Sequence, residues 1–320
     1  MDKLTDPGSG PESAKDGAGS SRGITAEGLE LLLGKLIGRM AVCPSDDVLS
    51  RLSEMKENET ERGAAAVYEC MFRNLDISRR MLRPFCQDTG ILHFYIRAGA
   101  AFRLLPDVER VVRDAALAAS ANVPLRPNAV LPFTDKNTGN NIGPCAPYIH
   151  WEITGGDSAE ITVYMAGGGS SLPGFARVLT PSQGYGAVED LVAEAVRTKG
   201  VNSCPPLIAG VGIGPSMEIA AELSKKALLR RCGSKNPDPD ARAMEERLFR
   251  RLNAMRIGPG GTGGSESMLA VNVEAGAHHP ATLAMAVSFG CWATRKGVLF
   301  IDGEGNATVT SHRDFSGNDG

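Results

Sequence analysis

The hydrophobic positions of this chain follow two different periods, which predict a mixture of helices and strands. After Thr25, a residue type that often caps helices, segment 24–40 carries apolar residues at helical spacing, and a second helical segment runs from Ser45 to about Met81. We expect these two segments to form an N-terminal helical region. The same spacing predicts four further helices, at 108–122, 187–200, 216–233 and 240–256.

Short runs of bulky apolar residues predict the strands. They cover residues 91–99, 146–154, 159–166, 204–214, 268–276, 282–290 and 297–303. The acidic turn GGDS at 155–158 joins the second and third of these runs and predicts a hairpin. Together the elements indicate an α/β fold, with mixed α+β as the alternative. We expect one large domain over residues 24–312, with an N-terminal helical segment and a buried mixed sheet.

The two ends of the chain lack this pattern. Residues 1–23 are rich in Gly, Ser, Pro and Asp and contain almost no large apolar side chain, so they cannot bury enough surface to offset the ordering entropy. We therefore expect a disordered tail at 1–23 and a flexible C-terminal tail at 313–320.

Composition and charge are those of an ordinary globular protein. Of the 320 residues, 42% are hydrophobic and 22% are charged, and the formal net charge of -3 argues against a nucleic-acid partner. Apolar runs such as 207–213 are too short to span a bilayer, and the first residues contain no apolar signal core. We expect a cytoplasmic protein with no membrane association, whose seven cysteines remain reduced thiols.

Two glycine loops follow predicted strands. GVGIGPS at 210–216 lies where a dinucleotide fingerprint would lie, but Pro215 occupies the position of the third glycine, which disfavours a nucleotide-binding enzyme. VYMAGGGSSLPG at 163–174 has three consecutive glycines, whose backbone N–H groups could approach a small anion or could simply form a turn. It lacks the Lys-Ser/Thr ending of a P-loop.

The cysteines contain no C-x-x-C pair, which argues against a zinc ribbon or a thioredoxin-type site. Cys86, Cys204 and Cys291 each stand at a junction between predicted elements. Three thiolates that converge from such junctions could hold an iron-sulfur cluster with one open iron. From spacing alone, scattered structural cysteines are the favoured interpretation.

Eight motifs occur in the same order as in a known family and cover nearly everything from about residue 30 to about residue 312. On these motifs the chain resembles the alpha subunit of the iron-sulfur hydro-lyases, the family that contains L(+)-tartrate dehydratase and the class I fumarases. The motifs are CQDTG, LRPNAV, NTGNNIG, the glycine loop, NSCPP with GVGIG, KALLRRCGSKNPDP, HHPATLAMAV and GCWATRKG.

The resemblance implies a 4Fe-4S cluster held by three cysteines, which match Cys86, Cys204 and Cys291. The other cysteines match no ligand position. In such a site the open iron can act as a Lewis acid on a substrate hydroxyl and a neighbouring carboxylate.

The resemblance also implies a set of substrate-binding residues, and each has a chemical rationale. Arg126 can clamp a carboxylate with two hydrogen bonds, and Gln87 can donate an amide hydrogen bond. Asp88 could orient the substrate or carry a proton, and His279 is a proton-relay or carboxylate-binding candidate. Gly168 and Gly169 complete the set.

A partner and a substrate follow from the same resemblance. Single-chain class I fumarases continue into a second domain that this chain lacks, so we expect a separate beta subunit that closes the active site over a small dicarboxylate, in an alpha2-beta2 complex. The loop MAGGGSSLPG looks more like the tartrate dehydratase version than the fumarase version. Ser170 and Ser171 offer hydroxyls that a substrate with a second hydroxyl could use.

We therefore expect dehydration of L-(+)-tartrate to oxaloacetate. A class I fumarase alpha subunit, which interconverts malate and fumarate, is the alternative. A non-enzymatic iron-sulfur sensor is a third interpretation, but a sensor would not need the predicted substrate-binding residues.

Overall fold

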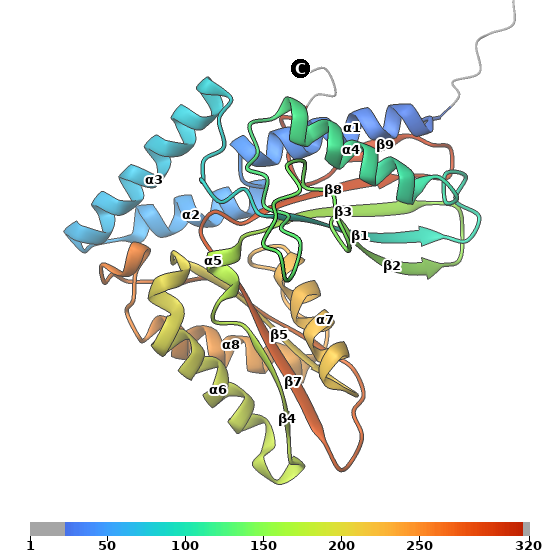
Figure 1. Ribbon diagram of the computed structural model, residues 1–320. Coiled ribbons are helices and arrows are strands. Elements are labelled where there is room, and N and C mark those ends of the chain that lie inside the picture. Colours follow the sequence, from blue (N-terminus) through green and yellow to red (C-terminus); the bar gives the residue numbers. More distant parts are fainter. Residues whose placement is uncertain (1–22, 316–320) are drawn as a thin grey trace, which may run out of the picture.

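The computed structural model describes residues 23–315 (Figure 1). The predicted N-terminal tail therefore lies outside the described residues except for Gly23, and the predicted C-terminal tail lies outside them from residue 316 onward. Residues 313–315 lie against the helical region, where the backbone N–H of Arg313 donates to Oδ2 of Asp46 at 2.8 Å.

Three helices open the described chain, where two helical segments were predicted. They are α1 (Ala26–Val42), α2 (Asp46–Asn58) and α3 (Arg62–Met81). Thr25 caps α1 as expected, since its Oγ1 accepts from the backbone N–H of Gly28 at 3.1 Å. The predicted second segment is interrupted between α2 and α3. There the Glu59 side chain accepts the backbone N–H groups of Thr60 and Glu61, both at 2.9 Å.

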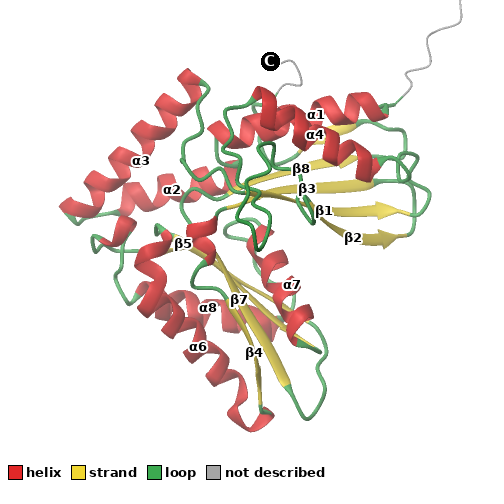
Figure 2. Ribbon diagram, in the orientation of Figure 1, coloured by secondary structure: helices red, strands yellow, loops and turns green. Residues whose placement is uncertain are grey.

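The first sheet has the order β2-β1-β3-β8-β9 and is mixed. Helix α1 and helix α4 (Val108–Asn122) cover one of its faces with a continuous apolar core (Figure 2). Side chains such as Phe94, Ile96, Ile161 and Val163 point into this core because successive strand residues alternate between faces. The strands are β1 (Ile91–Gly99), β2 (Tyr148–Thr154), β3 (Ala159–Ala166), β8 (Arg295–Ile301) and β9 (Ala307–Val309).

The predicted hairpin of β2 and β3 is wrong, although both strands form. Strand β1 lies between them, parallel to β2 and antiparallel to β3. The GGDS turn crosses the end of β1, so closely that a Cβ atom on Gly99 would lie 2.1 Å from the carbonyl oxygen of Gly156. Glycine at position 99 therefore permits a crossing that the pattern of apolar residues alone does not reveal.

The second sheet has the order β4-β7-β5-β6. One face packs against α6 (Gly184–Lys199) and α8 (Pro239–Asn253), and the other packs against α7 (Met217–Leu229). Glycines of the GVGIG motif let α7 approach, because a Cβ on Gly212 would lie 2.0 Å from the carbonyl oxygen of Ala220. These glycines thus serve helix packing. The strands are β4 (Phe175–Leu179), β5 (Leu207–Gly214), β6 (Met268–Ala275) and β7 (Leu283–Gly290).

A buried ion pair joins the first sheet to helix α2. Nζ of Lys296 on β8 lies 2.9 Å from Oδ2 of Asp47, and both side chains are almost fully buried. The same ammonium group donates to the carbonyl oxygen of Arg230, at 2.6 Å, just after α7. Helix α7 was predicted to continue to Gly233, but it ends at Leu229, where the chain turns into this contact.

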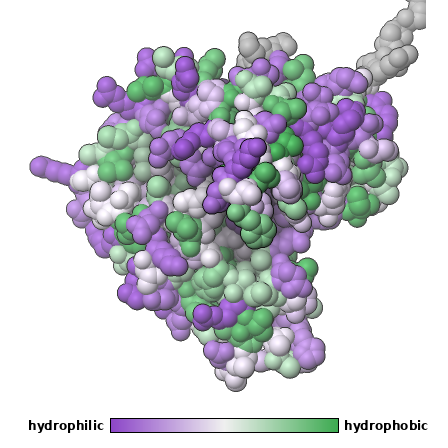
Figure 3. All heavy atoms as spheres, in the orientation of Figure 1, coloured by the Kyte–Doolittle hydropathy of each residue, from purple (hydrophilic) through white to green (hydrophobic). Residues whose placement is uncertain are grey.

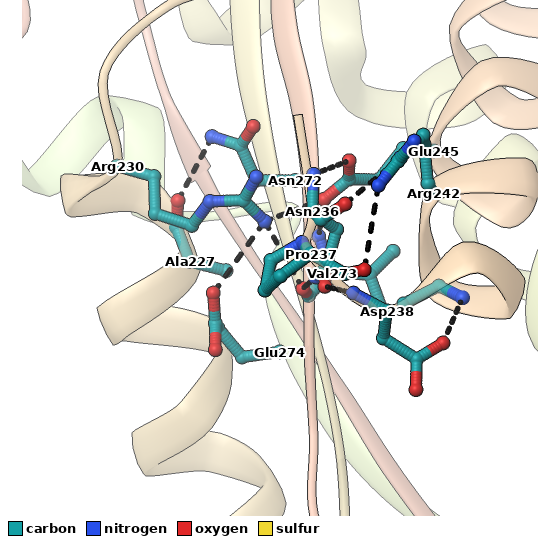
Figure 4. A network of polar contacts seen from close by, with 11 residues as sticks. Ala227, Arg230, Asn236, Pro237, Asp238, Arg242, Glu245, Asn272, Val273 and Glu274 are labelled. Atoms are coloured by element: carbon teal, nitrogen blue, oxygen red, sulfur yellow. Dashed lines mark hydrogen bonds and ion pairs between the residues drawn. The ribbon is translucent and has the colours of Figure 1, made fainter. Parts of the chain in front are cut away.

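A second buried polar network fixes the segment that follows α7 (Figure 4). Nη1 of Arg230 lies 2.5 Å from Oε1 of Glu245 on α8, and the same oxygen accepts the backbone N–H of Val273 on β6 at 2.8 Å. Asn236 donates from Nδ2 to the carbonyl oxygen of Val273 at 2.6 Å. Glu245 is nearly inaccessible to solvent, and its hydrogen bonds and ion pair offset the free-energy cost of burying its carboxylate.

The α/β prediction is confirmed, with one domain and an N-terminal helical region. The division of the strands between two sheets was not predicted, and neither were β4 and β9. No helix among residues 23–315 is long and apolar enough to cross a membrane.

Candidate active site

The structure places Cys86, Cys204 and Cys291 at three junctions that converge. Strands β5 and β7 are antiparallel neighbours, with Ile208 opposite Gly290, so Cys204 before β5 and Cys291 after β7 lie at the same end of the second sheet. The backbone N–H of Trp292 donates to the carbonyl oxygen of Cys204 at 3.3 Å. Cys86 and Cys291 both pack against the same small apolar cluster of Leu75, Phe85 and Ala293.

The thiols also interact electrostatically. Burial raises the pKa of Cys291 to about 12, and the neighbouring Cys86 and Cys204 add to this effect. Burial likewise raises the pKa of Cys204, followed by the influence of Cys86 and Asp88. Cys86 thus raises the pKa of both other thiols, which places it close to each of them.

The Asp88 carboxylate ties the CQDTG loop to the glycine loop. Oδ2 accepts the backbone N–H of Gly168 at 2.8 Å, and Oδ1 accepts the backbone N–H of Gly90 at 3.0 Å. Nδ2 of Asn128, from the LRPN motif, is 3.5 Å from Oδ1. Gly90 has a φ of +79°, and a Cβ there would lie 2.8 Å from the carbonyl oxygen of Ala166. Only glycine fits this end of CQDTG against the strand that precedes the glycine loop.

The LRPN motif is attached to the same loop. Oγ1 of Thr89 accepts the backbone N–H of Arg126 at 3.0 Å. The side chains of Arg126 and Gln87 are exposed, as are Gly168 and Gly169 at the start of the short helix α5 (Gly168–Ser171). The structure therefore brings all predicted substrate-binding residues except His279 into loops that meet beside the three cysteines.

His279 lies at the other end of the second sheet. It stands in the loop before β7, whereas Cys291 follows β7, and a strand of eight residues spans about 26 Å at ~3.3 Å per residue. The exposed His279 ring accepts the backbone N–H of Ala281 at Nδ1, 3.1 Å away. Within one chain His279 is therefore remote from the three thiols, and a catalytic role for it requires a site that includes another chain.

Comparison with known proteins shows the family of this chain. The family model described as Fumarate hydratase (Fumerase) matches residues 31–299, which include all three cysteines. The chain belongs to the fumarate hydratase family. It is therefore a hydro-lyase enzyme. The L(+)-tartrate dehydratase subunit alpha of Escherichia coli is 44% identical over 268 residues, which is 83% of this chain and 88% of that protein.

Two further relatives show how widely this similarity extends. The protein of the same name from Shigella sonnei has the same identity and coverage. A putative L(+)-tartrate dehydratase subunit alpha from Methanocaldococcus jannaschii is 30% identical over 272 residues, 83% of this chain and 95% of that protein.

One residue of the candidate active site was not predicted from the sequence. Arg295 begins β8 with its side chain almost fully buried, and its Nη2 donates to the carbonyl oxygen of Asp88. Its guanidinium lies 5.8 Å from the centre of the Phe85 ring, and it lowers the otherwise raised pKa of Cys291. The residue lies within the GCWATRKG motif, but nothing in that motif shows that the arginine turns inward.

Arg295 also bears on whether these residues fit an iron-sulfur cluster. Nε and Nη1 of Arg295 are buried and have no hydrogen-bond partner among the described residues. A buried cation with free donors beside three thiols is matched by an anionic group, and a cluster bound by three thiolates supplies one. No group of three His, Cys, Asp or Glu side chains in residues 23–315 could hold a single metal ion. A 4Fe-4S cluster binds each thiolate through a different iron, so three cysteines that converge from separate junctions fit its donor chemistry.

The serines of the glycine loop do not project freely into the site. Ser170 and Ser171 both donate from Oγ to the carbonyl oxygen of Gly167, at 3.3 and 2.8 Å. Their protons are thus used within the loop, and only their lone pairs remain available to a substrate hydroxyl. A cavity of about 430 Å³ lies elsewhere, between α7 and the uncovered face of the first sheet, where Tyr95, His150 and Lys226 contribute to its wall.

Proposed function

We propose that this chain is the alpha subunit of an iron-sulfur-dependent hydro-lyase that dehydrates L-(+)-tartrate to oxaloacetate. The convergence of Cys86, Cys204 and Cys291 beside the loop fixed by Asp88 carries this proposal. The relatives named as L(+)-tartrate dehydratase subunit alpha support the choice of reaction.

The three cysteines would hold the 4Fe-4S cluster. When bound, the cluster supplies an open iron that acts as a Lewis acid on a substrate hydroxyl and carboxylate. The buried guanidinium of Arg295 compensates the negative charge that three thiolates bring into this environment. Its hydrogen bond to the carbonyl oxygen of Asp88 also fixes the CQDTG loop next to the thiols.

The remaining residues bind and orient the substrate. The exposed guanidinium of Arg126 clamps one carboxylate with two parallel hydrogen bonds, and the Gln87 amide donates to a substrate oxygen. Each carboxylate oxygen of Asp88 already accepts a backbone N–H. These contacts favour a positioning role for Asp88, which keeps the glycine loop at a fixed distance from the substrate.

The site is incomplete within this chain. A dicarboxylate presents two anionic groups, and Arg126 is the one cation among the predicted substrate residues that lie near the cysteines. We propose that a beta subunit supplies further groups for binding and proton transfer in an alpha2-beta2 complex. The designation of the relatives as subunit alpha supports a second kind of subunit.

An anaerobic assay tests the substrate. The reconstituted alpha and beta chains are assayed on L-tartrate and on malate, and we expect a higher kcat/KM for L-tartrate. A preference for malate by more than about tenfold, or roughly 1.4 kcal/mol of transition-state binding, would favour the fumarase alternative.

A further inference from the structure

Five exposed apolar side chains stand next to the candidate active site along the chain. We call them the apolar rim. Each belongs to a segment that carries a site motif: the approach to CQDTG, the loop after LRPN, the glycine loop or the turn before Cys204. The members of the rim are Leu82, Val130, Phe133, Leu172 and Val201.

The segments that carry the rim are joined to one another. The Asp88 carboxylate binds the glycine loop, Thr89 binds the backbone of Arg126, and α5 packs against the 3-10 turn Gly200–Ser203 that precedes Cys204. The rim residues therefore lie on joined segments that border the three junctions presenting the thiols. Figure 3 shows hydrophobic and polar residues interspersed on one face of the molecule.

Two members of the rim have a backbone conformation that does not suit them. Leu82 has a φ of +50° and Phe133 a φ of +69°, in the left-handed region that favours Gly, Asn and Asp. The Phe133 ring is fully exposed, and Leu82 is 69% exposed. A bulky apolar residue gains nothing from either feature in the isolated chain. Departures of this kind from local preference are typical of functional positions.

We propose that the apolar rim is the docking surface that holds the beta subunit over the candidate active site. This inference rests on the proposed function. The occupant follows from the position of the rim and from the relatives' designation as subunit alpha, because the rim segments border a site in which Arg126 is the one predicted carboxylate clamp. A partner bound there buries the five apolar side chains and brings its own cationic groups to the substrate. Exposed aromatic and aliphatic anchors around a polar centre are the usual source of binding energy in such an interface.

Variants of the full chain test the proposal by their affinity for the separately purified beta subunit, measured by isothermal titration calorimetry without cluster or substrate. Phe133→Asn and Leu82→Asn suit the left-handed backbone better, so the melting temperature of the isolated chain should stay unchanged or rise. Leu172→Asp, at a side chain that is 68% exposed, is matched by the control Leu31→Asp on α1, which is 62% exposed.

We expect each rim variant to raise the Kd for the beta subunit at least about tenfold, and the Leu31 variant to leave it unchanged. Unchanged affinity in all three rim variants, or an equal loss in the control, would overturn the docking surface while the proposed reaction stands. Sedimentation of the alpha chain alone tests whether a second alpha chain, instead of the beta subunit, binds the rim. If the rim variants break a dimer of alpha chains and leave beta binding intact, the rim binds a second alpha chain and the proposed partner is wrong. If the wild-type chain binds no beta subunit, both the rim and the two-subunit part of the proposed function fail.

Discussion

Oδ2 of Asp88 accepts the backbone N–H of Gly168 at 2.8 Å, across a separation of eighty residues in the chain. This bond joins the loop that carries the first cysteine to the loop that follows β3. The backbone N–H of Gly90 donates to Oδ1, so each carboxylate oxygen of Asp88 accepts a backbone hydrogen bond. The sequence left open whether Asp88 moves a proton or holds the site in place, and this geometry favours the second role.

Two substitutions at Asp88 separate these roles. Asp88→Asn keeps one oxygen acceptor and should retain measurable turnover, whereas Asp88→Ala releases both backbone N–H groups and should lower kcat/KM by at least about a hundredfold. Iron and sulfide content should stay at the wild-type level in both variants, because the three cysteines remain. An equal loss of turnover in the Asn and Ala variants would instead indicate that Asp88 transfers a proton.

Arg295 should stabilise the cluster-bound state at the expense of the cluster-free chain. Two of its buried donor atoms have no partner among the described residues, so Arg295→Met removes an uncompensated buried cation and one hydrogen bond to Asp88. We expect the melting temperature of the cluster-free chain not to fall, while the iron retained after anaerobic purification decreases. Normal iron content in the variant would show that Arg295 does not serve the cluster.

The candidate site was more predictable from the sequence than its surroundings. The cysteine junctions and the CQDTG and LRPN loops are local motifs, and the structure brings them together, whereas the predicted His279 lies at the far end of β7. Arg295 was missed because only the tertiary packing against Phe85 shows that its side chain turns inward. The hairpin of β2 and β3 was wrong for a related reason, since strand pairing is a long-range choice and β1 lies between two runs that are adjacent in sequence.

His93 should make the stability of the cluster-free chain depend on pH. Burial lowers the pKa of His93 to about 4, with a further contribution from His150. The unfolded chain, with an ordinary pKa near 6.5, binds a proton first as the pH falls, so this contribution is fully present above about pH 6.5 and is lost between there and about pH 4. Burial also lowers the pKa of His150 and His312, so His93→Gln should reduce, by about 2 kcal/mol, the loss of stability that urea unfolding shows between pH 7 and pH 5.

The exposed His279 supplies the control for this experiment. His279→Gln should keep the pH dependence of the wild-type chain. If His93→Gln also keeps it, burial of a neutral His93 does not contribute to the pH dependence.

The buried Arg230–Glu245 pair should contribute strongly to stability. Glu245→Ala removes the nearer of the two carboxylates that contact Arg230, the other being Glu274 at 3.4 Å, and leaves the backbone N–H of Val273 without its acceptor. We therefore expect the free energy of unfolding to fall by about 3 kcal/mol. Glu246→Ala, at the exposed neighbouring position on α8, should change it by less than about 0.5 kcal/mol. Equal effects of the two substitutions in chemical denaturation would mean that the network in Figure 4 does not stabilise the fold.

The central claim is that Cys86, Cys204 and Cys291 together hold one 4Fe-4S cluster, and iron and acid-labile sulfide analysis of anaerobically purified chain tests it most directly. We expect about four irons and four sulfides per wild-type chain, as in the cluster itself. Replacing any one of these cysteines by serine should remove the cluster, and Cys232→Ser should retain it. Full iron content in a variant of Cys86, Cys204 or Cys291, or its loss in the Cys232 variant, would contradict the assignment.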